Sequence, residues 1–105
     1  MPEARRLARV TPSTLCREVQ GEAVLLQLDS GEYFGLDAVA TRIWQLIVER
    51  SDLAEVEAAM LSEYDVERTV LAADLDRVIH ELTLKHLIEV ETTTAQQHAD
   101  GMGNV

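Results

Sequence analysis

The fold is decided by the stretch Leu28-Asp-Ser-Gly-Glu-Tyr-Phe-Gly-Leu-Asp37. Residues that favour β-structure stand on both sides of its Asp-Ser-Gly segment, in the ranges 23–28 and 32–36. Gly31 can adopt the positive φ that a three-residue hairpin loop requires. The sequence therefore predicts a β-hairpin that ends at Asp37.

The expected loop length sets the register of this hairpin. If Leu28 lies opposite Glu32, alternation along the two strands gathers five apolar side chains on one face, which we expect to cover the core. The five are Val24, Leu26, Leu28, Phe34 and Leu36. The opposite face receives Leu25, Gln27, Tyr33 and Gly35 and is only half polar.

An earlier segment, Leu15–Val19, is expected to pair with strand 23–28 and so leave strand 32–36 at the edge of the sheet. An edge strand presents unpaired N–H and C=O groups, which must be covered, blunted or used. An extended peptide could pair with this edge and place alternate side chains in a groove beside the third helix. The alternative is that Tyr33 and Phe34 simply pack on their own domain.

Three helices are expected after the hairpin, which makes the fold class α+β. Asp37 can cap the first, whose apolar residues recur at spacings of three and four. The second begins near Asp52, where Glu55 three residues later resembles a capping box. The third runs over about 67–85 and is the longest. Its apolar stripe consists of Leu71, Leu75, Val78 and Leu82.

The two ends of the chain carry little to bury. Residues 1–13 combine arginines with two prolines and show no periodicity, so we expect a flexible N-terminal arm. Residues 92–105 are rich in Thr, Gln and Gly, which is typical of a disordered tail. The folding unit is therefore expected over 14–91, with the apolar piece 87–90 lying against the helices or adding a short strand.

Composition limits the partners. The 105 residues include 19 acidic and 9 basic ones, so the formal net charge of −10 would repel nucleic acid and anionic membranes alike. Cys16 is the only cysteine, and we find neither a signal-peptide pattern nor about 18 consecutive apolar residues. These features favour a cytoplasmic protein.

The sequence offers no pattern for catalysis. His80, His86 and His98 are the only histidines, and their spacing matches no metal site. The carboxylates of the helices alternate with apolar residues, as on a solvated face, and no phosphate loop or nucleophile motif occurs. We therefore expect neither a metal, nor a cofactor, nor catalytic residues, and we do not expect an enzyme.

A combination of motifs matches a family pattern. It consists of the stretch 28–37, then Ala40, Ile43, Trp44 and Leu46, then Tyr64-Asp65-Val66, Asp74-Leu75, Val78-Ile79, Leu82 and Leu87-Ile88. Over about residues 15–90, the chain resembles the PqqD-like proteins, which are leader-binding recognition elements of ribosomally synthesised and post-translationally modified peptides (RiPPs). His86 departs from the pattern, because the family often has a glycine before the closing apolar pair.

The resemblance implies a winged helix-turn-helix-like fold in which a three-stranded antiparallel sheet is followed by three helices. A precursor's leader peptide would pair with the third strand and fill the cleft to the third helix. Carried over to this sequence, the leader-binding residues would be Glu32, Tyr33, Phe34, Gly35, Leu36, Val70, Ala73, Asp74, Arg77 and Val78. Alternatively, Asp74 and Arg77 form a simple surface ion pair.

Within the family, the chain is most similar to the stand-alone leader-binding proteins of lasso-peptide pathways, which act beside a separate leader peptidase and a cyclase. One alternative is a PqqD-type chaperone that presents a precursor peptide to a radical-SAM enzyme. Two others are a structural dimer joined through the strand edge and a DNA-binding winged-helix regulator. The regulator would require a basic third helix, whereas this one is rich in acidic residues.

Overall fold

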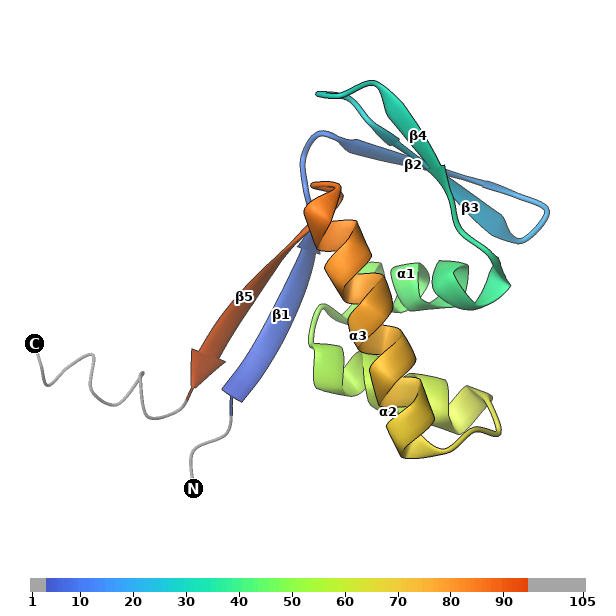
Figure 1. Ribbon diagram of the computed structural model, residues 1–105, viewed down its shortest axis with the longest axis vertical. Coiled ribbons are helices and arrows are strands. Elements are labelled where there is room, and N and C mark those ends of the chain that lie inside the picture. The colour runs from blue at the N-terminus through green and yellow to red at the C-terminus, as the bar shows by residue number, and fades with distance from the viewer. Residues whose placement is uncertain (1–3, 95–105) are drawn as a thin grey trace, which may run out of the picture.

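The computed structural model describes residues 4–94 and divides them into a three-stranded antiparallel sheet, a two-stranded ribbon and three helices (Figure 1). The elements are β1 (Ala4–Val10), β2 (Thr14–Val19), β3 (Glu22–Gln27), β4 (Glu32–Gly35), α1 (Ala38–Arg50), α2 (Leu53–Glu63), α3 (Arg68–Leu84) and β5 (Ile88–Thr94). The sheet has the order β2-β3-β4, and the ribbon pairs β1 with β5. The expected α+β fold, with three antiparallel strands followed by three helices, is confirmed.

The register of the β3–β4 hairpin differs from the expected one by one residue. Gln27, not Leu28, lies opposite Glu32, so the loop contains the four residues 28–31. The Gly31 N–H donates to the Gln27 carbonyl at 2.7 Å, and Gly31 has the expected positive φ, at +76°. Because side chains alternate with a period of two, this shift turns every β3 side chain to the opposite face.

The buried face of β3 is therefore not the one expected from sequence. Leu25 is fully buried and lies opposite Phe34, whereas Leu28 is 51% exposed in the loop. Gln27, expected on the outer face, is only 2% exposed. On β4 the expectation holds, because Phe34 packs against the core.

The helices begin where local chemistry favours them. The Asp37 side chain accepts a hydrogen bond from the Ala40 N–H at 2.8 Å and caps α1, as expected. Asp52 caps α2 by accepting from the Ala54 N–H at 2.9 Å. The expected apolar stripe of α3 is buried, and it includes Leu71, Leu75, Val78 and Leu82.

The segment expected as a flexible arm contains a strand instead. β1 pairs with β5 along its whole length, and its residue Ala8 is fully buried. The Ala8 N–H also donates to the Ser51 carbonyl at 2.8 Å, which ties the ribbon to the link between α1 and α2. β5 extends the expected folding unit to Thr94, while the rest of the expected tail lies outside the described residues.

Two arginines of β1 explain why this polar segment is ordered. Arg5 contacts Asp52 at 3.0 Å, and Arg6 contacts Asp76 of α3 at 3.2 Å. Burial raises the pKa of Asp52, but the hydrogen bonds from Ala54 and Arg5 outweigh this effect, so the pKa lies below its usual range. Both arginine side chains remain largely exposed, but they link the ribbon to α2 and α3.

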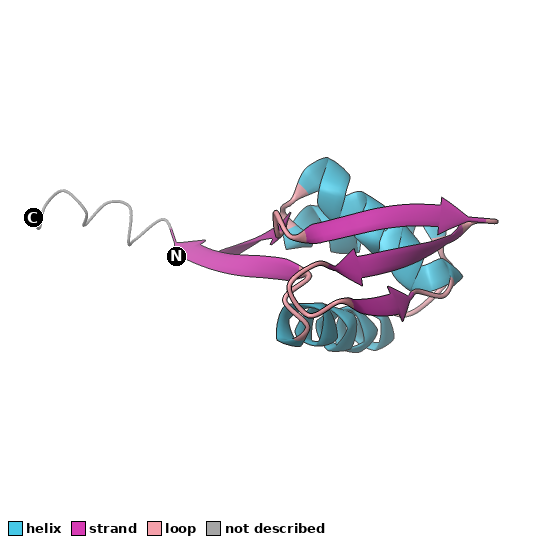
Figure 2. Ribbon diagram, turned by 90° about the horizontal axis from the view of Figure 1, so that it is seen from above, coloured by secondary structure: helices cyan, strands magenta, loops and turns pink. Residues whose placement is uncertain are grey.

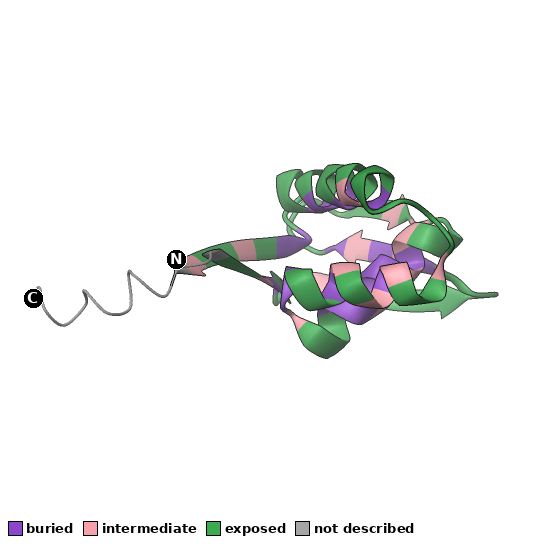
Figure 3. Cartoon of the chain, turned by 90° about the horizontal axis from the view of Figure 1, so that it is seen from below, coloured by how far each residue is buried: buried purple, intermediate pink, exposed green. Residues whose placement is uncertain are grey.

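The helices cover one face of the β2-β3-β4 sheet, and α3 runs beside its β4 edge (Figures 1 and 2). Buried residues gather where the sheet and the helices face one another (Figure 3). The largest fully buried side chains include Leu25, Ile43, Leu46, Ile47, Met60 and Leu87. The core therefore joins the sheet to all three helices.

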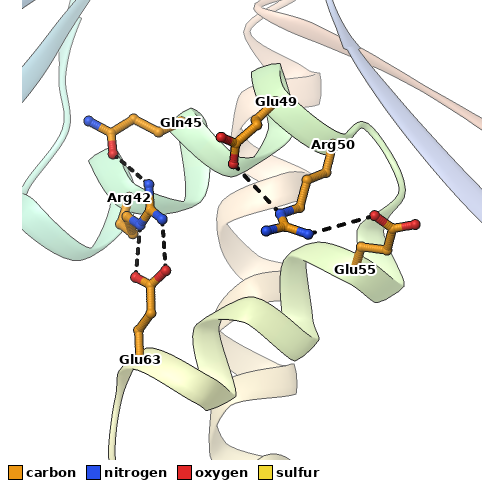
Figure 4. Close-up of polar contacts among 6 residues, drawn as sticks. All are labelled: Arg42, Gln45, Glu49, Arg50, Glu55 and Glu63. Carbon is orange, nitrogen blue, oxygen red and sulfur yellow. Dashed lines mark hydrogen bonds and ion pairs between the residues drawn. The ribbon is translucent and has the colours of Figure 1, made fainter.

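The outer sides of α1 and α2 carry a set of mutually paired charges, which we call the α1–α2 ionic face (Figure 4). Its residues are Arg42, Gln45, Glu49, Arg50, Glu55 and Glu63. Arg42 binds both carboxylate oxygens of Glu63, at 2.8 and 2.7 Å. The hydrogen bonds from Arg42 lower the pKa of Glu63, although partial burial opposes them. Arg50 approaches Glu49 and Glu55 only to 3.6 and 3.9 Å, so Arg42–Glu63 is the tightest ion pair of this face.

Candidate functional site

A groove of about 540 Å³ separates β4 from α3. One wall is β4 and the start of α1, the other is α3, and the end of α2 closes one end. The lining residues are Tyr33, Phe34, Gly35, Leu36, Asp37, Val39, Ala40, Ile43, Met60, Tyr64, Val66, Val70, Leu71, Asp74, Arg77, Val78, Glu81, Leu82, Lys85 and Leu87. Most of them are apolar, so the groove offers a hydrophobic surface between two polar rims.

Among residues 4–94, the β4 wall presents a free backbone edge, because β4 is the last strand of its sheet. The Leu36 N–H donates to the Ala23 carbonyl at 2.8 Å, which directs the backbone of residue 36 toward β3. Since the direction alternates along an antiparallel strand, Tyr33 and Gly35 direct their N–H and C=O groups outward. These groups can hydrogen-bond to an added strand.

The α3 wall combines an apolar base with a charged rim. Val78 is 8% exposed, while Val70, one end of the wall, is 51% exposed. The rim residues alternate in sign along the helix and are Asp74, Arg77, Glu81 and Lys85. Asp74 and Arg77 approach only to 3.9 Å and are both more than half exposed, so they are held loosely.

Lys85 at the end of α3 reaches across to β4. Its Nζ lies 4.9 Å from the centroid of the Phe34 ring, within the range of a cation–π contact. This contact closes the end of the groove that is nearest to the hairpin loop. Lys85 was not among the predicted site residues, although its position four residues after Glu81 on the same side of α3 was a usable signal.

Eight of the ten residues predicted for the site line the groove. They are Tyr33, Phe34, Gly35, Leu36, Val70, Asp74, Arg77 and Val78. Glu32 starts β4 but borders a smaller adjacent pocket, and Ala73 is exposed on α3 outside the groove. Ala73 lies outside the groove because, although it follows Val70 by only three positions, it lies farther round the helix from Val70 than Asp74 does.

The second helix also contributes residues to the groove that were not predicted from the sequence. Met60, Tyr64 and Val66 line the groove from α2 and from the link to α3. Tyr64 and Val66 belong to the motif Tyr64-Asp65-Val66 that supported the family resemblance, which was the available signal. Their place could not be derived locally, because it depends on how α2 packs against α3.

The groove offers a largely apolar surface for binding. Among residues 4–94, we find no cluster of three or more side chains that could hold a metal ion. Burial, followed by the charge of Glu18, raises the pKa of Cys16, which disfavours the reactive thiolate form. An extended, largely apolar peptide matches the shape and polarity of the groove.

Comparison with known proteins gives the class. The family model described as "Coenzyme PQQ synthesis protein D (PqqD)" matches residues 22–88, and the chain therefore belongs to the PqqD family. It is a PqqD-like RiPP recognition element. No curated protein matches the chain.

Two solved structures are similar to the chain. The first, "TbiB1 in Complex with the TbiA(beta) Leader Peptide", has a TM-score of 0.74 and 37% identity, covering 77% of this chain and 94% of that one. The second, "Lasso peptide synthetase B1 complexed with the leader peptide", has a TM-score of 0.71 and 29% identity, covering 78% and 96%. Both relatives are complexes with leader peptides. Within the described part of this chain, no helix has the length and apolarity required to span a membrane.

Proposed function

We propose that the chain is a non-catalytic protein that binds the leader segment of a ribosomally made precursor peptide in lasso-peptide biosynthesis. The observation that carries the proposal is the groove between β4 and α3, with a free strand edge along one wall. The leader complexes of the two similar B1 proteins support the same ligand class.

In the proposed complex, the leader adds to β4 as a fourth strand. The outward N–H and C=O groups of Tyr33 and Gly35 supply backbone hydrogen bonds, which are independent of the leader's sequence. Every second leader side chain enters the apolar groove, where Val70 and Val78 line the opposite wall. Specificity therefore comes from the shape of the groove and from its charged rim.

The bound leader is delivered, in this proposal, to a separate leader peptidase and a cyclase in the cytoplasm. The description of the matching family also favours a second candidate, a chaperone that presents its peptide to a radical-SAM enzyme. The genes beside this one distinguish the two, because a small protease and an asparagine-synthetase-like cyclase belong to the first pathway only. The rim of α3 does not favour DNA binding, since it carries acidic residues, Asp74 and Glu81, between its basic ones.

A proline substitution in the β4 edge tests strand addition. Gly35→Pro removes one outward N–H group without touching the bonds to β3, and proline is tolerated on such an edge. The probe is a fluorescein-labelled synthetic leader with the sequence encoded by the precursor gene beside this one. We expect its affinity in a polarisation titration to fall about tenfold or more, because a lost hydrogen bond leaves the partner group of the leader unpaired.

Gly35→Ala is the matched control. Gly35 does not have a positive φ, and a Cβ there would meet no atom within 4 Å in the free protein. This variant keeps the N–H group and should bind several-fold more tightly than Gly35→Pro. Equal affinities of the two variants would exclude pairing through Gly35, and no binding by the unchanged protein would exclude the function itself.

A further inference from the structure

A buried polar cluster lies outside the groove, at the junction between α3 and β5. Gln27 of β3 is 2% exposed, and its amide donates to the His86 carbonyl at 2.9 Å and to the Ser13 hydroxyl at 3.1 Å. Thr11, 8% exposed, donates from its hydroxyl to the same His86 carbonyl at 2.9 Å. Two side chains from distant parts of the sequence thus converge on one backbone oxygen.

The position of this carbonyl gives the cluster its importance. His86 directly follows the C-cap of α3 and has a positive φ of +61°, so the chain turns sharply there. Gln27 lies opposite Glu32, the first residue of β4. The cluster therefore links the end of one groove wall to the beginning of the other.

The Thr11 N–H and the Thr14 hydroxyl also donate to the next carbonyl, that of Leu87, at 3.1 and 3.3 Å, but neither residue belongs to β3 or β4. α3 packs mainly against α2 and β5, and the groove itself lies between α3 and β4. Lys85 touches the Phe34 ring, but this side chain is long, exposed and flexible. The two hydrogen bonds to the His86 carbonyl are 2.9 Å long and come from buried side chains, so they are the more rigid link.

Burial alone does not explain a glutamine at this place. The neighbouring inward-facing residues of β3, Ala23 and Leu25, are apolar and fully buried. An apolar side chain at position 27 would satisfy packing equally well, whereas a buried amide must have its partners in fixed directions. All of its polar atoms have partners, including the Asp29 N–H.

We infer that Gln27, assisted by Thr11, is a positioning residue for leader binding, which holds the end of α3 at the separation from β4 that one added strand requires. This role rests on the proposed function, but it does not require Gln27 to touch the leader. Without the clamp, the free protein samples other separations, and only the competent fraction binds. The apparent Kd rises in inverse proportion to that fraction.

The test combines affinity with a distance measurement. Gln27→Met keeps the side-chain volume but cannot donate to the His86 carbonyl. Spin labels at cysteines placed at Ser30 and Ala73, with Cys16 replaced by serine, report the separation of the hairpin and α3 by pulsed electron paramagnetic resonance. In Gln27→Met, we expect a broader distance distribution in the free protein and about tenfold weaker leader binding.

Thr11→Val provides a second variant that removes the other donor, and it should give the same two changes in smaller measure. Asp52→Ala is the control for stability alone, because it removes the α2 cap far from the groove and should leave both the distances and the Kd unchanged. A Gln27→Met protein with the distance distribution and Kd of the unchanged protein would overturn the inference. Failure of the unchanged protein to bind would instead refute the proposed function, and the distances in the free protein would still test the clamp.

Discussion

The charged rim of the groove and the α1–α2 ionic face both carry ion pairs between acidic and basic side chains, but they differ in how tightly their best pair is held. On the ionic face, Arg42 grips both oxygens of Glu63 at 2.8 and 2.7 Å. In the groove, Asp74 and Arg77 are 3.9 Å apart, and no strand of the described part of the chain pairs with the outer edge of β4. The comparison teaches that a binding surface is recognised by unpaired groups beside exposed apolar residues, and not by its charge.

The largest effect on this difference should come from a charge in the apolar wall of the groove. In Val70→Asp, the new carboxylate is exposed in the free protein, but a bound leader would cover it without a partner. We expect leader affinity to fall about 30- to 100-fold, equivalent to ~2–3 kcal/mol, in the polarisation titration.

Val48→Asp is the matched control, because Val48 is 60% exposed on α1 and lies outside the groove. It should bind the leader like the unchanged protein. Equal losses in the two variants would show that the effect is not specific to the groove.

A smaller effect is expected from the α2 cap. Asp52→Ala removes the hydrogen bonds to Ala54 and Arg5, so the free energy of unfolding should fall by ~1–2 kcal/mol in urea titrations. Asp52→Asn retains a capping oxygen and should lose less. If Asp52→Ala weakened leader binding as well, the cap and the groove would not be independent parts of the molecule.

A gain of stability is expected at the turn after α3. Because His86 has a φ of +61°, His86→Gly relieves a conformation that costs an L-residue about 1–2 kcal/mol, and the greater freedom of glycine in the unfolded chain offsets part of this. The net gain should be ~0.5 kcal/mol in urea titrations. Gly31→Ala, at a φ of +76°, should have the opposite sign. A loss of stability in His86→Gly would show that the imidazole itself contributes.

The smallest effect should be the pH dependence of the ionic face. The pKa of Glu63 is lowered in the folded protein, so its contribution is present above its unfolded pKa, about 4.3, and is lost as the pH falls through the folded value. In urea titrations below pH 5, the free energy of unfolding of Glu63→Gln should therefore fall less steeply with decreasing pH than that of the unchanged protein. An unchanged slope would mean that this ion pair contributes nothing measurable.

Local chemistry in the sequence predicted the elements that it controls. Asp37 caps α1, Gly31 takes the positive φ of the hairpin loop, and β4 lies at the edge of the sheet. These features depend on residues close together in the chain. The groove followed from them, because an edge strand before three helices leaves one helix beside it.

The register of the hairpin could not be predicted in the same way. Apolar counting favoured burying Leu28, but the structure buries Gln27, because a carbonyl 59 residues later in the sequence accepts its hydrogen bond. The ribbon was missed for the same reason. The local sequence around Arg6 is typical of a solvated arm, because its ion-pair partner Asp76 lies 70 residues away in the chain.

The ribbon has a practical consequence for joining this domain to other proteins. Ala4 and Thr94 are partners in the β1–β5 pairing, so the two ends of the described chain lie side by side, away from the β2-β3-β4 sheet (Figure 1). Domains whose ends adjoin tolerate insertion and circular permutation well. This domain could therefore be inserted into a loop of a host enzyme, or reopened elsewhere after its ends are linked, with the groove left accessible.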